Sequence, residues 1–311
     1  MEHNNNNISY YKLEIKLKCK YHKHIINCST ILNDGRIVTC SDDESIIIYN
    51  NKTFKPELII KEHTEPVNYI LKLFSGMLAS CSNDSTIKIF NIKYKNYELL
   101  QTLNYHKDWV YKIIELNNKK LVSCSYNSPI FVYSKDNNNK YTKDYDIITN
   151  AKCFCIIQTK ENEICYNDEN ANCSIFFYDL LTLKVIKNIR NISVSSQDSF
   201  NMITKDLLLI TGKDNLYIIN VNNHKLKRTI YVPDSSVITT SCMLNKNIIV
   251  TGDSNKKIKQ WKIEGNNLIL ISKKENAHIS RITTIKKLKD GYILSGSFDG
   301  DFKIWHYYLS N

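Results

Sequence analysis

The chain has 311 residues, 42 Lys and Arg against 31 Asp and Glu (a formal net charge of +11), and 42% hydrophobic residues. This length allows two ordinary domains or one large β architecture, and the composition excludes collagen-like and fully disordered classes. No stretch approaches the roughly 18 consecutive apolar residues of a membrane-spanning helix. The residues after Met1 are Asn-rich and lack an apolar core, so we expect no secretory signal and no secretion.

The first elements along the chain are a tail and a strand. Residues 1–9 are polar and Asn-rich, and we expect a disordered tail there, followed by a single domain over residues 10–311. Residues 10–18 alternate polar and apolar side chains, which predicts a β-strand. The chain has only eight Gly and four Pro, a scarcity that is more usual in helical proteins. The segments that follow nevertheless have β patterns.

From residue 22 onward, one pattern of four residues repeats. A His is followed by Ser or Thr, then Asp or Asn, then an aromatic residue, at intervals of 17, 4 and 6. A fifth unit keeps the last two intervals, with Asp234 where the His would stand. Internal repeats of this kind decide the architecture. The units are His22, Thr39, Asp43 and Tyr49; His63, Ser80, Asp84 and Phe90; His106, Ser123, Asn127 and Tyr133; His278, Ser295, Asp299 and Trp305; and the partial Thr251, Asn255 and Trp261.

Between these anchors the sequence predicts strands and hairpin turns. Short β-branched and aromatic runs such as 45–49 and 302–305 end at the aromatic residue that closes each unit. Further runs of the same kind, such as 36–39, lie ahead of them in the sequence. Turn pairs such as Asp34-Gly35 and Asn117-Asn118 separate the runs. Since Asn and Asp tolerate positive φ, we expect them to replace Gly in many of these turns.

The spacing of the closing residues gives the number of units. Their separations lie between 41 and 45 residues, the period of a four-stranded propeller blade. Seven units result, beginning near residues 22, 63, 106, 151, 194, 235 and 278. The last unit lacks residues for a fourth strand, so we predict that the strand at 10–18 completes it and closes the ring. The closing residues are Tyr49, Phe90, Tyr133, Tyr178, Ile219, Trp261 and Trp305.

These intervals resemble those of the WD-repeat β-propeller family, although the Gly-His and Trp-Asp dipeptides of that family are mostly missing. The resemblance implies an all-β, seven-bladed β-propeller with four-stranded antiparallel blades. It also implies a structural role for the repeated residues, in which Asp binds His, His binds Ser, and Ser meets the Trp indole. We expect only one complete tetrad, with weaker blades around Tyr49, Phe90 and Tyr133. The tetrad is His278, Ser295, Asp299 and Trp305.

A recurring His, Ser and Asp could also indicate a hydrolase. The set recurs once per unit, however, its Ser lies inside a strand, and no oxyanion donors are identifiable. The ten Cys show no C-x-x-C pair or zinc-finger spacing. Cys153 and Cys155 would share a strand face, either as a metal or redox pair or, the reading we favour, as buried packing. We therefore predict no enzyme activity, catalytic residue, cofactor or metal, and a reducing compartment, the cytoplasm or the nucleus.

Two features of the sequence leave alternatives open. Units four and five are degenerate, since Ala151 replaces the His and unit five keeps Asp214 but ends at Ile219. The polar stretch 167–172 is either sequence drift or a partner-specific insert. The Lys clusters, including Lys256, Lys257 and Lys259, are typical of solvated strand faces. Only four residues are Arg, and they are far apart in the sequence, which argues against a nucleic-acid groove.

In the WD-repeat family, partners contact residues about three and five positions after the His and one position before the Asp. Exposed Trp, Tyr and Arg dominate binding energies. For Trp109 the alternative is packing in the strand core. We predict a non-catalytic scaffold or adaptor that is a subunit of a larger complex. It would bind a peptide or partner protein on the top face of the propeller, where these contact positions lie. The alternative is a nucleic-acid or ribonucleoprotein-associated propeller that uses Lys-rich surfaces. The predicted contact residues are Trp109, Tyr111, Tyr126, Arg281, Phe298 and Glu65.

Overall fold

The β-branched and aromatic runs form strands throughout the described chain. The computed structural model describes residues 11–149, 152–169, 173–213, 215–232, 236–265, 267–289 and 291–309. Within these ranges it contains 28 β-strands and no helix. Accordingly, no helix of the described residues is long and apolar enough to span a membrane. The predicted tail at 1–9 lies outside the described residues.

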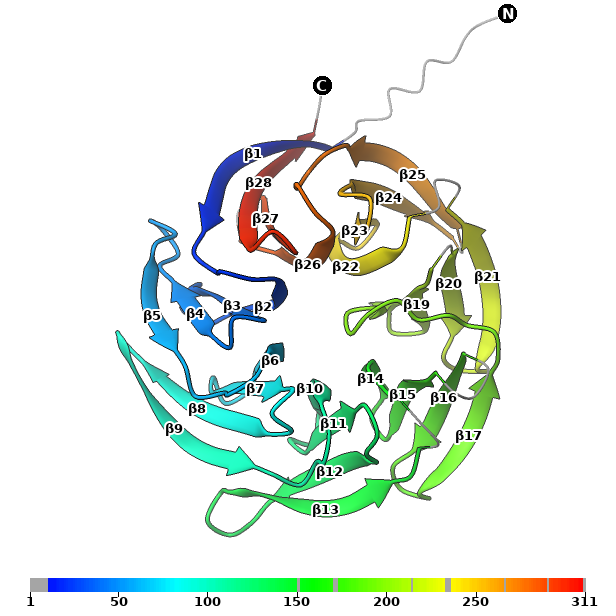
Figure 1. Ribbon diagram of the computed structural model, residues 1–311. Helices are drawn as coiled ribbons and strands as arrows, with labels where there is room; N and C mark the ends of the chain where they lie inside the picture. The colour runs from blue at the N-terminus through cyan, green and yellow to red at the C-terminus, as the bar shows by residue number, and fades with distance from the viewer. Residues whose placement is uncertain are drawn as a thin grey trace, which may run out of the picture.

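The strands form seven four-stranded antiparallel sheets, or blades, arranged in a ring (Figure 1). The first three blades follow one another in the sequence, and in each the first strand is innermost. Blade one contains β2 (Ile26–Ile31), β3 (Ile37–Ser41), β4 (Ile46–Tyr49) and β5 (Pro56–Ile60); blade two β6 (Val67–Lys72), β7 (Leu78–Ser82), β8 (Ile87–Lys93) and β9 (Asn96–Leu103); blade three β10 (Val110–Glu115), β11 (Leu121–Ser125), β12 (Ile130–Lys135) and β13 (Tyr141–Ile147).

The remaining blades repeat this order, and the last one also takes the first strand of the chain. Blade four contains β14 (Ile156–Lys160), β15 (Glu163–Asp168), β16 (Ser174–Asp179) and β17 (Lys184–Ile189); blade five β18 (Phe200–Thr204), β19 (Leu207–Thr211), β20 (Asn215–Asn220) and β21 (Lys225–Tyr231); blade six β22 (Ile238–Asn245), β23 (Ile248–Asp253), β24 (Ile258–Glu264) and β25 (Asn267–Lys274); blade seven β26 (Ile282–Lys287), β27 (Tyr292–Ser297), β28 (Asp301–Leu309) and β1 (Tyr11–Lys20).

Blade seven confirms the predicted closure of the ring. β1 pairs antiparallel with β28, from Tyr11 opposite Leu309 to Lys20 opposite Asp301, with a bulge between Ile15 and Leu17. The strand runs two residues beyond the predicted end at 18. Because β1 occupies the outer position of this blade, the two ends of the described chain hold each other in one sheet (Figure 1).

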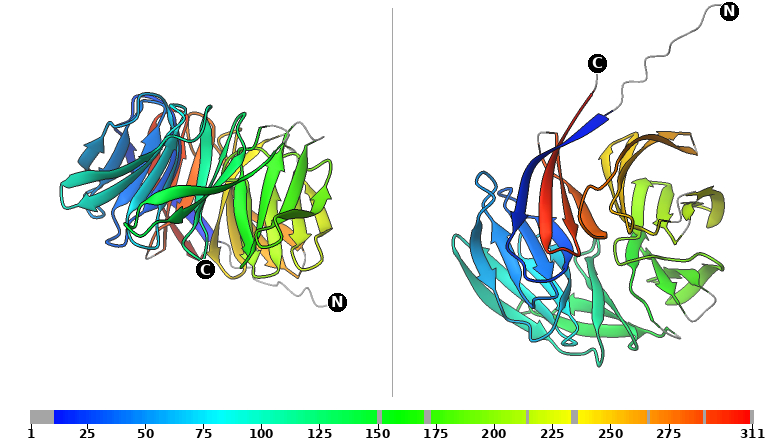
Figure 2. Two further views of the ribbon diagram at one scale, coloured as in Figure 1. Left: turned by 90° about the horizontal axis from the view of Figure 1, so that it is seen from below. Right: turned by 45° about the horizontal axis from the view of Figure 1, so that its top comes forward.

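The apolar core lies between neighbouring blades. Blade seven shows the pattern: Leu13 of β1, Ile293 of β27 and Trp305 of β28 pack in one cluster with Val250 of blade six. Another cluster joins Ile48 of blade one to Ile89 of blade two. Each blade therefore buries its flat sides against two neighbours, and the disc that results is one blade thick (Figure 2, left).

The disc has two faces made by different connections. We call the first the loop face: it is formed by the connections from one blade to the next and by those from the second to the third strand of each blade. We call the other the turn face: it is formed by the tighter connections from the first to the second strand and from the third to the fourth. Residues 61–66 and 298–300 are examples of the loop face, and 73–77 and 94–95 of the turn face.

The turns differ from the expectation that Asn and Asp would supply positive φ. Twelve non-Gly residues of the described chain have positive φ, and only three of them, Asn139, Asn191 and Asn276, are Asn, while none is Asp. Asn and Asp act instead through their side chains. Asn50 Oδ1, for example, accepts the backbone N–H of Lys52 at 2.9 Å, and Asp136 Oδ1 accepts that of Asn138 at 2.8 Å.

The cysteines are mostly buried, as expected, with one correction. Cys153 and Cys155 precede β14 rather than sharing a strand face. Cys153 packs in the apolar cluster of Cys124, whereas Cys155 packs in that of Cys165. They therefore serve two different blade junctions. Among the described residues, Cys173 is the exposed exception, and no group of three or more His, Cys, Asp or Glu could hold a metal ion.

Candidate interaction surface

The repeated polar residues form hydrogen-bonded chains inside the blades. In blade one, His22 Nδ1 lies 2.9 Å from Asp43 Oδ2 and His22 Nε2 lies 2.7 Å from the Thr39 hydroxyl. The Thr39 hydroxyl in turn lies 3.3 Å from the Tyr49 hydroxyl. Burial by itself would raise the pKa of Asp43. The hydrogen bond and the charge of His22 outweigh this effect and hold that pKa below its ordinary range.

Blade seven has the same chain with one longer link. Trp305 Nε1 donates to the Ser295 hydroxyl at 2.7 Å, and His278 Nε2 lies 2.7 Å from the same oxygen. His278 Nδ1, however, lies 3.6 Å from Asp299 Oδ2, beyond hydrogen-bond distance, and has no hydrogen-bond partner among the described residues. The expectation that only this tetrad is complete is therefore wrong: Tyr49 reaches Thr39 through its hydroxyl, so hydrogen bonds join all four residues of blade one.

Blades two and three each lack one member. His63 bridges Asp84 and Ser80 at 2.7 Å each, but Phe90 provides no donor. In blade three His106 Nε2 lies 2.6 Å from Ser123, while its Nδ1 has no partner because Asn127 turns away to Asp108. The hydroxyls of Thr39, Ser80, Ser123 and Ser295 are wholly buried within strands, so this array holds the blades together and presents no nucleophile to solvent.

On the loop face, aromatic side chains of blade three and its neighbour form a group. The Trp109 and Tyr126 ring centroids are 5.7 Å apart, and Tyr111 lies 6.2 Å from Tyr126 and 6.3 Å from Phe154. Trp109 is 47% exposed. The alternative that Trp109 packs in the strand core is therefore wrong. We call Trp109, Tyr111, Tyr126 and Phe154 the aromatic group.

A second pair of predicted residues lies on blade seven. The Arg281 guanidinium stands over the Phe298 ring, 5.4 Å from its centroid. No ion pair is found for Arg281 within the described residues, and burial lowers its pKa. A half-buried guanidinium without a carboxylate retains its capacity to bind an anionic or carbonyl group.

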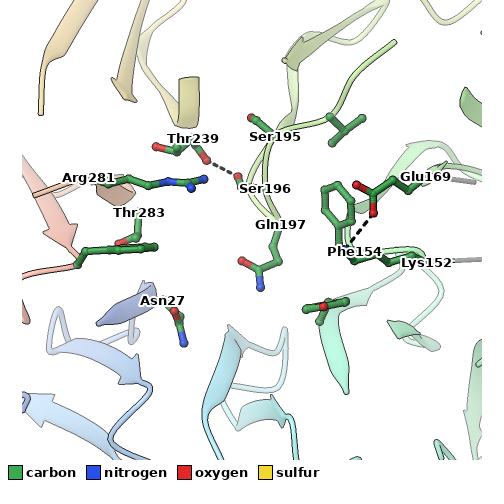
Figure 3. A pocket seen from close by; sticks show the side chains of 13 residues that line it. Asn27, Lys152, Phe154, Glu169, Ser195, Ser196, Gln197, Thr239, Arg281 and Thr283 are labelled. Carbon is green, nitrogen blue, oxygen red and sulfur yellow. Dashed lines mark hydrogen bonds and ion pairs between the residues drawn. The ribbon is translucent and has the colours of Figure 1, made fainter. Parts of the chain in front are cut away.

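A pocket of about 360 Å³ separates Arg281 and Phe298 from Tyr111 and Phe154. Figure 3 shows Arg281 on one side, Lys152 and Phe154 on the other, and Gln197 between them. Lys152 forms an ion pair of 3.0 Å with Glu169 at the rim. The pocket thus combines aromatic walls with one unpaired cation and several amide and hydroxyl groups, which suits a peptide segment better than a purely apolar ligand.

The bonding between neighbouring inner strands differs around this pocket, whose lining includes the bridging residues Asn27, Thr239 and Thr283 as well as Tyr111. Among the described residues, five of the seven blade junctions are bridged by a polar side chain that donates to the first residue of the next inner strand. Tyr111 stands at the corresponding position of blade three, packs on aromatic rings, and makes no such bond to any residue that the structure describes. The bridging pairs are Asn27 with Val67, Asn68 with Val110, Ser195 with Ile238, Thr239 with Ile282, and Thr283 with Ile26.

The predicted contact residues are thus only partly brought together. Tyr111, Arg281 and Phe298 line the pocket, and Trp109 and Tyr126 flank it through Tyr111. Glu65 does not line it. The carbonyl of Pro66 accepts the same backbone hydrogen bond in blade two as that of Arg281 in blade seven, so Pro66, and not Glu65, is the counterpart of Arg281.

Sequence reasoning missed the residues contributed by blades four and five. Gln197 belongs to a segment that reaches across the ring: its carbonyl accepts Lys112 Nζ of blade three at 2.5 Å, and the adjacent Asp198 pairs with Lys286 of blade seven at 3.2 Å. No repeat interval marks this segment. In the sequence, Phe154 lies between two cysteines. Residue 151, where the repeat would have a His, is an Ala outside the described residues. No residue of the repeat pattern therefore marked the position of Phe154 within unit four.

The family comparison agrees with this architecture. The model of the WD domain, G-beta repeat, matches residues 14–50, 54–91 and 271–306. Each match begins in the outer strand of one blade and continues through the first three strands of the next. A sequence repeat therefore spans parts of two blades, and the first repeat contributes the outer strand that closes blade seven. Fold and anchors define a seven-bladed β-propeller. The chain thus carries WD repeats in these three places and forms a seven-bladed β-propeller, as its resemblance predicted. No curated protein gives a significant match.

Proposed function

We propose that the protein is a non-catalytic scaffold or adaptor that binds a peptide segment of a partner protein on its loop face. WD-repeat propellers are typically interaction scaffolds of this kind. The observation that carries the proposal is the pocket in which Arg281 is stacked on Phe298, has no ion-pair partner among the described residues, and faces Tyr111 and Phe154. Aromatic and Arg side chains around a desolvated pocket are the usual anchors of binding energy.

The partner would insert a side chain or backbone turn into this pocket and lie across the aromatic group. Trp109 and Tyr126 continue the aromatic surface outward from Tyr111. The Arg281 guanidinium provides a fixed donor fork for a carboxylate or carbonyl of the partner, which would set its orientation. Because the inner strands lie in a closed ring, the surface is rigid and little ordering cost falls on the scaffold.

Affinity purification of the full chain from cells tests this proposal. The wild type is compared with Trp109→Ala/Arg281→Ala and with a control, Ile186→Ala/Lys187→Ala, in which the removed apolar and cationic side chains are exposed on the outer strand β17 and lie on neither face. We expect the loop-face variant to lose specific partners that the control retains, with unchanged melting temperatures. The same set of partners for all three proteins refutes the loop face as the docking surface.

A further inference from the structure

The net charge is divided unequally between the two faces of the disc. Among the described residues, the connections of the turn face carry ten Lys and Arg against four Asp and Glu. Those of the loop face, counted over the same ranges, carry nine Lys and Arg against eleven Asp and Glu. The turn face is therefore net positive and the loop face net negative, while the larger share of the net charge lies on the strands, which carry 23 Lys and Arg against 12 Asp and Glu.

The lysines of the turn face are largely uncompensated. Lys119 and seven further lysines are exposed, and no ion pair is found for any of these eight within the described residues. Lys120, by contrast, is paired with Asp144 at 2.6 Å, and Arg36 is held by Asp34 at 2.8 Å. Unpaired lysines are fully hydrated point charges that an anionic surface can attract. The seven are Lys52, Lys55, Lys95, Lys140, Lys205, Lys246 and Lys289.

Apolar side chains project from the same turns. Phe74, between β6 and β7, is 56% exposed, and Tyr94, between β8 and β9, is 75% exposed. Lys119 Nζ lies 4.2 Å from the Phe74 ring centroid and Lys95 Nζ lies 5.4 Å from that of Tyr94. Leu181, between β16 and β17, is exposed as well. These turns place exposed apolar or aromatic side chains near lysine ammonium groups, the combination that suits a membrane–water interface.

A pocket on the turn face repeats this chemistry in concave form. It has a volume of about 580 Å³ and lies between blades one and seven. The apolar side chains of Leu17, Phe54 and Leu288 line it, and so do Lys52 and Lys289. Apolar walls beside ammonium groups match the two parts of an anionic lipid, an acyl chain and a charged headgroup.

We propose that the turn face binds the surface of an anionic lipid bilayer. The lysines would meet the headgroups, and Phe74, Tyr94 and Leu181 would enter the interface. A nucleic acid fits this face less well, because it calls for Arg and for aromatic rings converging in one groove, whereas here the rings stand on separate turns and the one turn-face Arg is already paired. Bound in this way, the ring would present its loop face away from the bilayer.

Co-sedimentation of the full chain with vesicles tests this inference. Vesicles of phosphatidylcholine alone are compared with vesicles that also contain phosphatidylserine. We compare the wild type with a turn-face variant, Lys52→Glu/Lys205→Glu/Lys246→Glu, and with a loop-face variant of equal charge, Lys23→Glu/Lys61→Glu/Lys107→Glu. All six lysines are exposed. We expect binding only to the phosphatidylserine vesicles, weakened at least tenfold in the turn-face variant and nearly unchanged in the loop-face variant.

A second variant and a second probe separate the remaining explanations. Phe74→Ser/Tyr94→Ser should reduce the vesicle binding that persists at high salt, because salt screens the lysines but not apolar insertion. Absence of wild-type binding overturns the proposal, as does an equal loss in both charge variants. Binding of single-stranded RNA that depends on the turn-face lysines, without vesicle binding, would make this face a nucleic-acid surface instead.

Discussion

Lys259 and Asp253 form an ion pair of 3.2 Å inside blade six, where both side chains are almost wholly buried. Lys259 Nζ also donates to the Ser236 hydroxyl at 2.9 Å. Asp234, at the His position of this unit, lies outside the described residues. The expectation that Lys259 belongs to a solvated strand face is therefore wrong. The alternation of polar and apolar residues along β24 does not show that the Lys259 side chain is buried and points toward the Asp253 carboxylate at the end of β23.

The first prediction concerns this pair. Lys259→Met should lower the free energy of unfolding by about 3–5 kcal/mol, because it leaves the Asp253 carboxylate buried beside no cation. The double variant Lys259→Met/Asp253→Ser should recover most of this loss. Denaturant unfolding measures both, with Lys256→Met, at an exposed residue of the adjacent turn, as the control. A single variant no less stable than the control contradicts the assignment.

The second prediction concerns Gln260, the neighbour of Lys259. Its side chain is fully buried, and within the part of the chain that the structure describes neither its amide nitrogen nor its amide oxygen has a hydrogen-bond partner. Ile48 and Ile304 occupy the corresponding positions of blades one and seven. Gln260→Ile should therefore raise the free energy of unfolding by about 1–3 kcal/mol, since unpaired buried polar atoms are removed. The reverse change, Ile304→Gln, should destabilise; equal effects of the two variants would contradict this account.

The third prediction is a pH dependence that arises from His106. Burial lowers the pKa of His106 to about 3. The unfolded chain binds a proton at this residue near pH 6.5, and the folded chain does not until about pH 3. Since the unfolded state holds more protons in this window, stability should fall with decreasing pH, by about 1.4 kcal/mol per pH unit for this one group. Burial also lowers the pKa of His278, which adds to the slope.

The variant His106→Gln should flatten this slope in unfolding experiments between pH 6.5 and pH 4. His24→Gln, at an exposed residue, should leave it as it is. The aspartates of the polar chains do not mask the effect: hydrogen bonds and His charge hold the pKa values of Asp43, Asp84 and Asp299 low despite burial, so their stabilisation persists above about pH 4 and is lost only below it. An unchanged slope in His106→Gln contradicts the assignment.

The fourth prediction concerns ring closure. Deleting residues 1–18 removes most of β1, including Leu13, which packs beside Trp305, and Lys18, which lies 2.9 Å from buried Asp301. It also leaves β28 with an open edge. The melting temperature should fall sharply. Deleting residues 1–10, ahead of β1, is the control and should change it little; the same melting temperature for both truncations would show that β1 does not close the ring.

Within the blades, sequence reasoning reached the fold but not every link. Intervals of 17, 4 and 6 located the His, hydroxyl and carboxylate partners, because these contacts recur at one separation along the chain. Whether a Tyr hydroxyl can replace the Trp indole depends on the distance across two strands, and the structure shows that Tyr49 and Tyr133 both reach their partners, at 3.3 Å and 3.0 Å.

The sequence by itself determined the repeat, the number of blades and the strand that closes the ring, because each of these rests on contacts between neighbouring strands at a nearly constant separation. Only the tertiary structure decided which lysines are buried, where Gln197 and Phe154 line one pocket with Arg281, and that the turn face is net positive while the loop face is net negative. Those relationships join blades that are distant in sequence, and they come into being only when the ring closes and sets every connection on one of two faces.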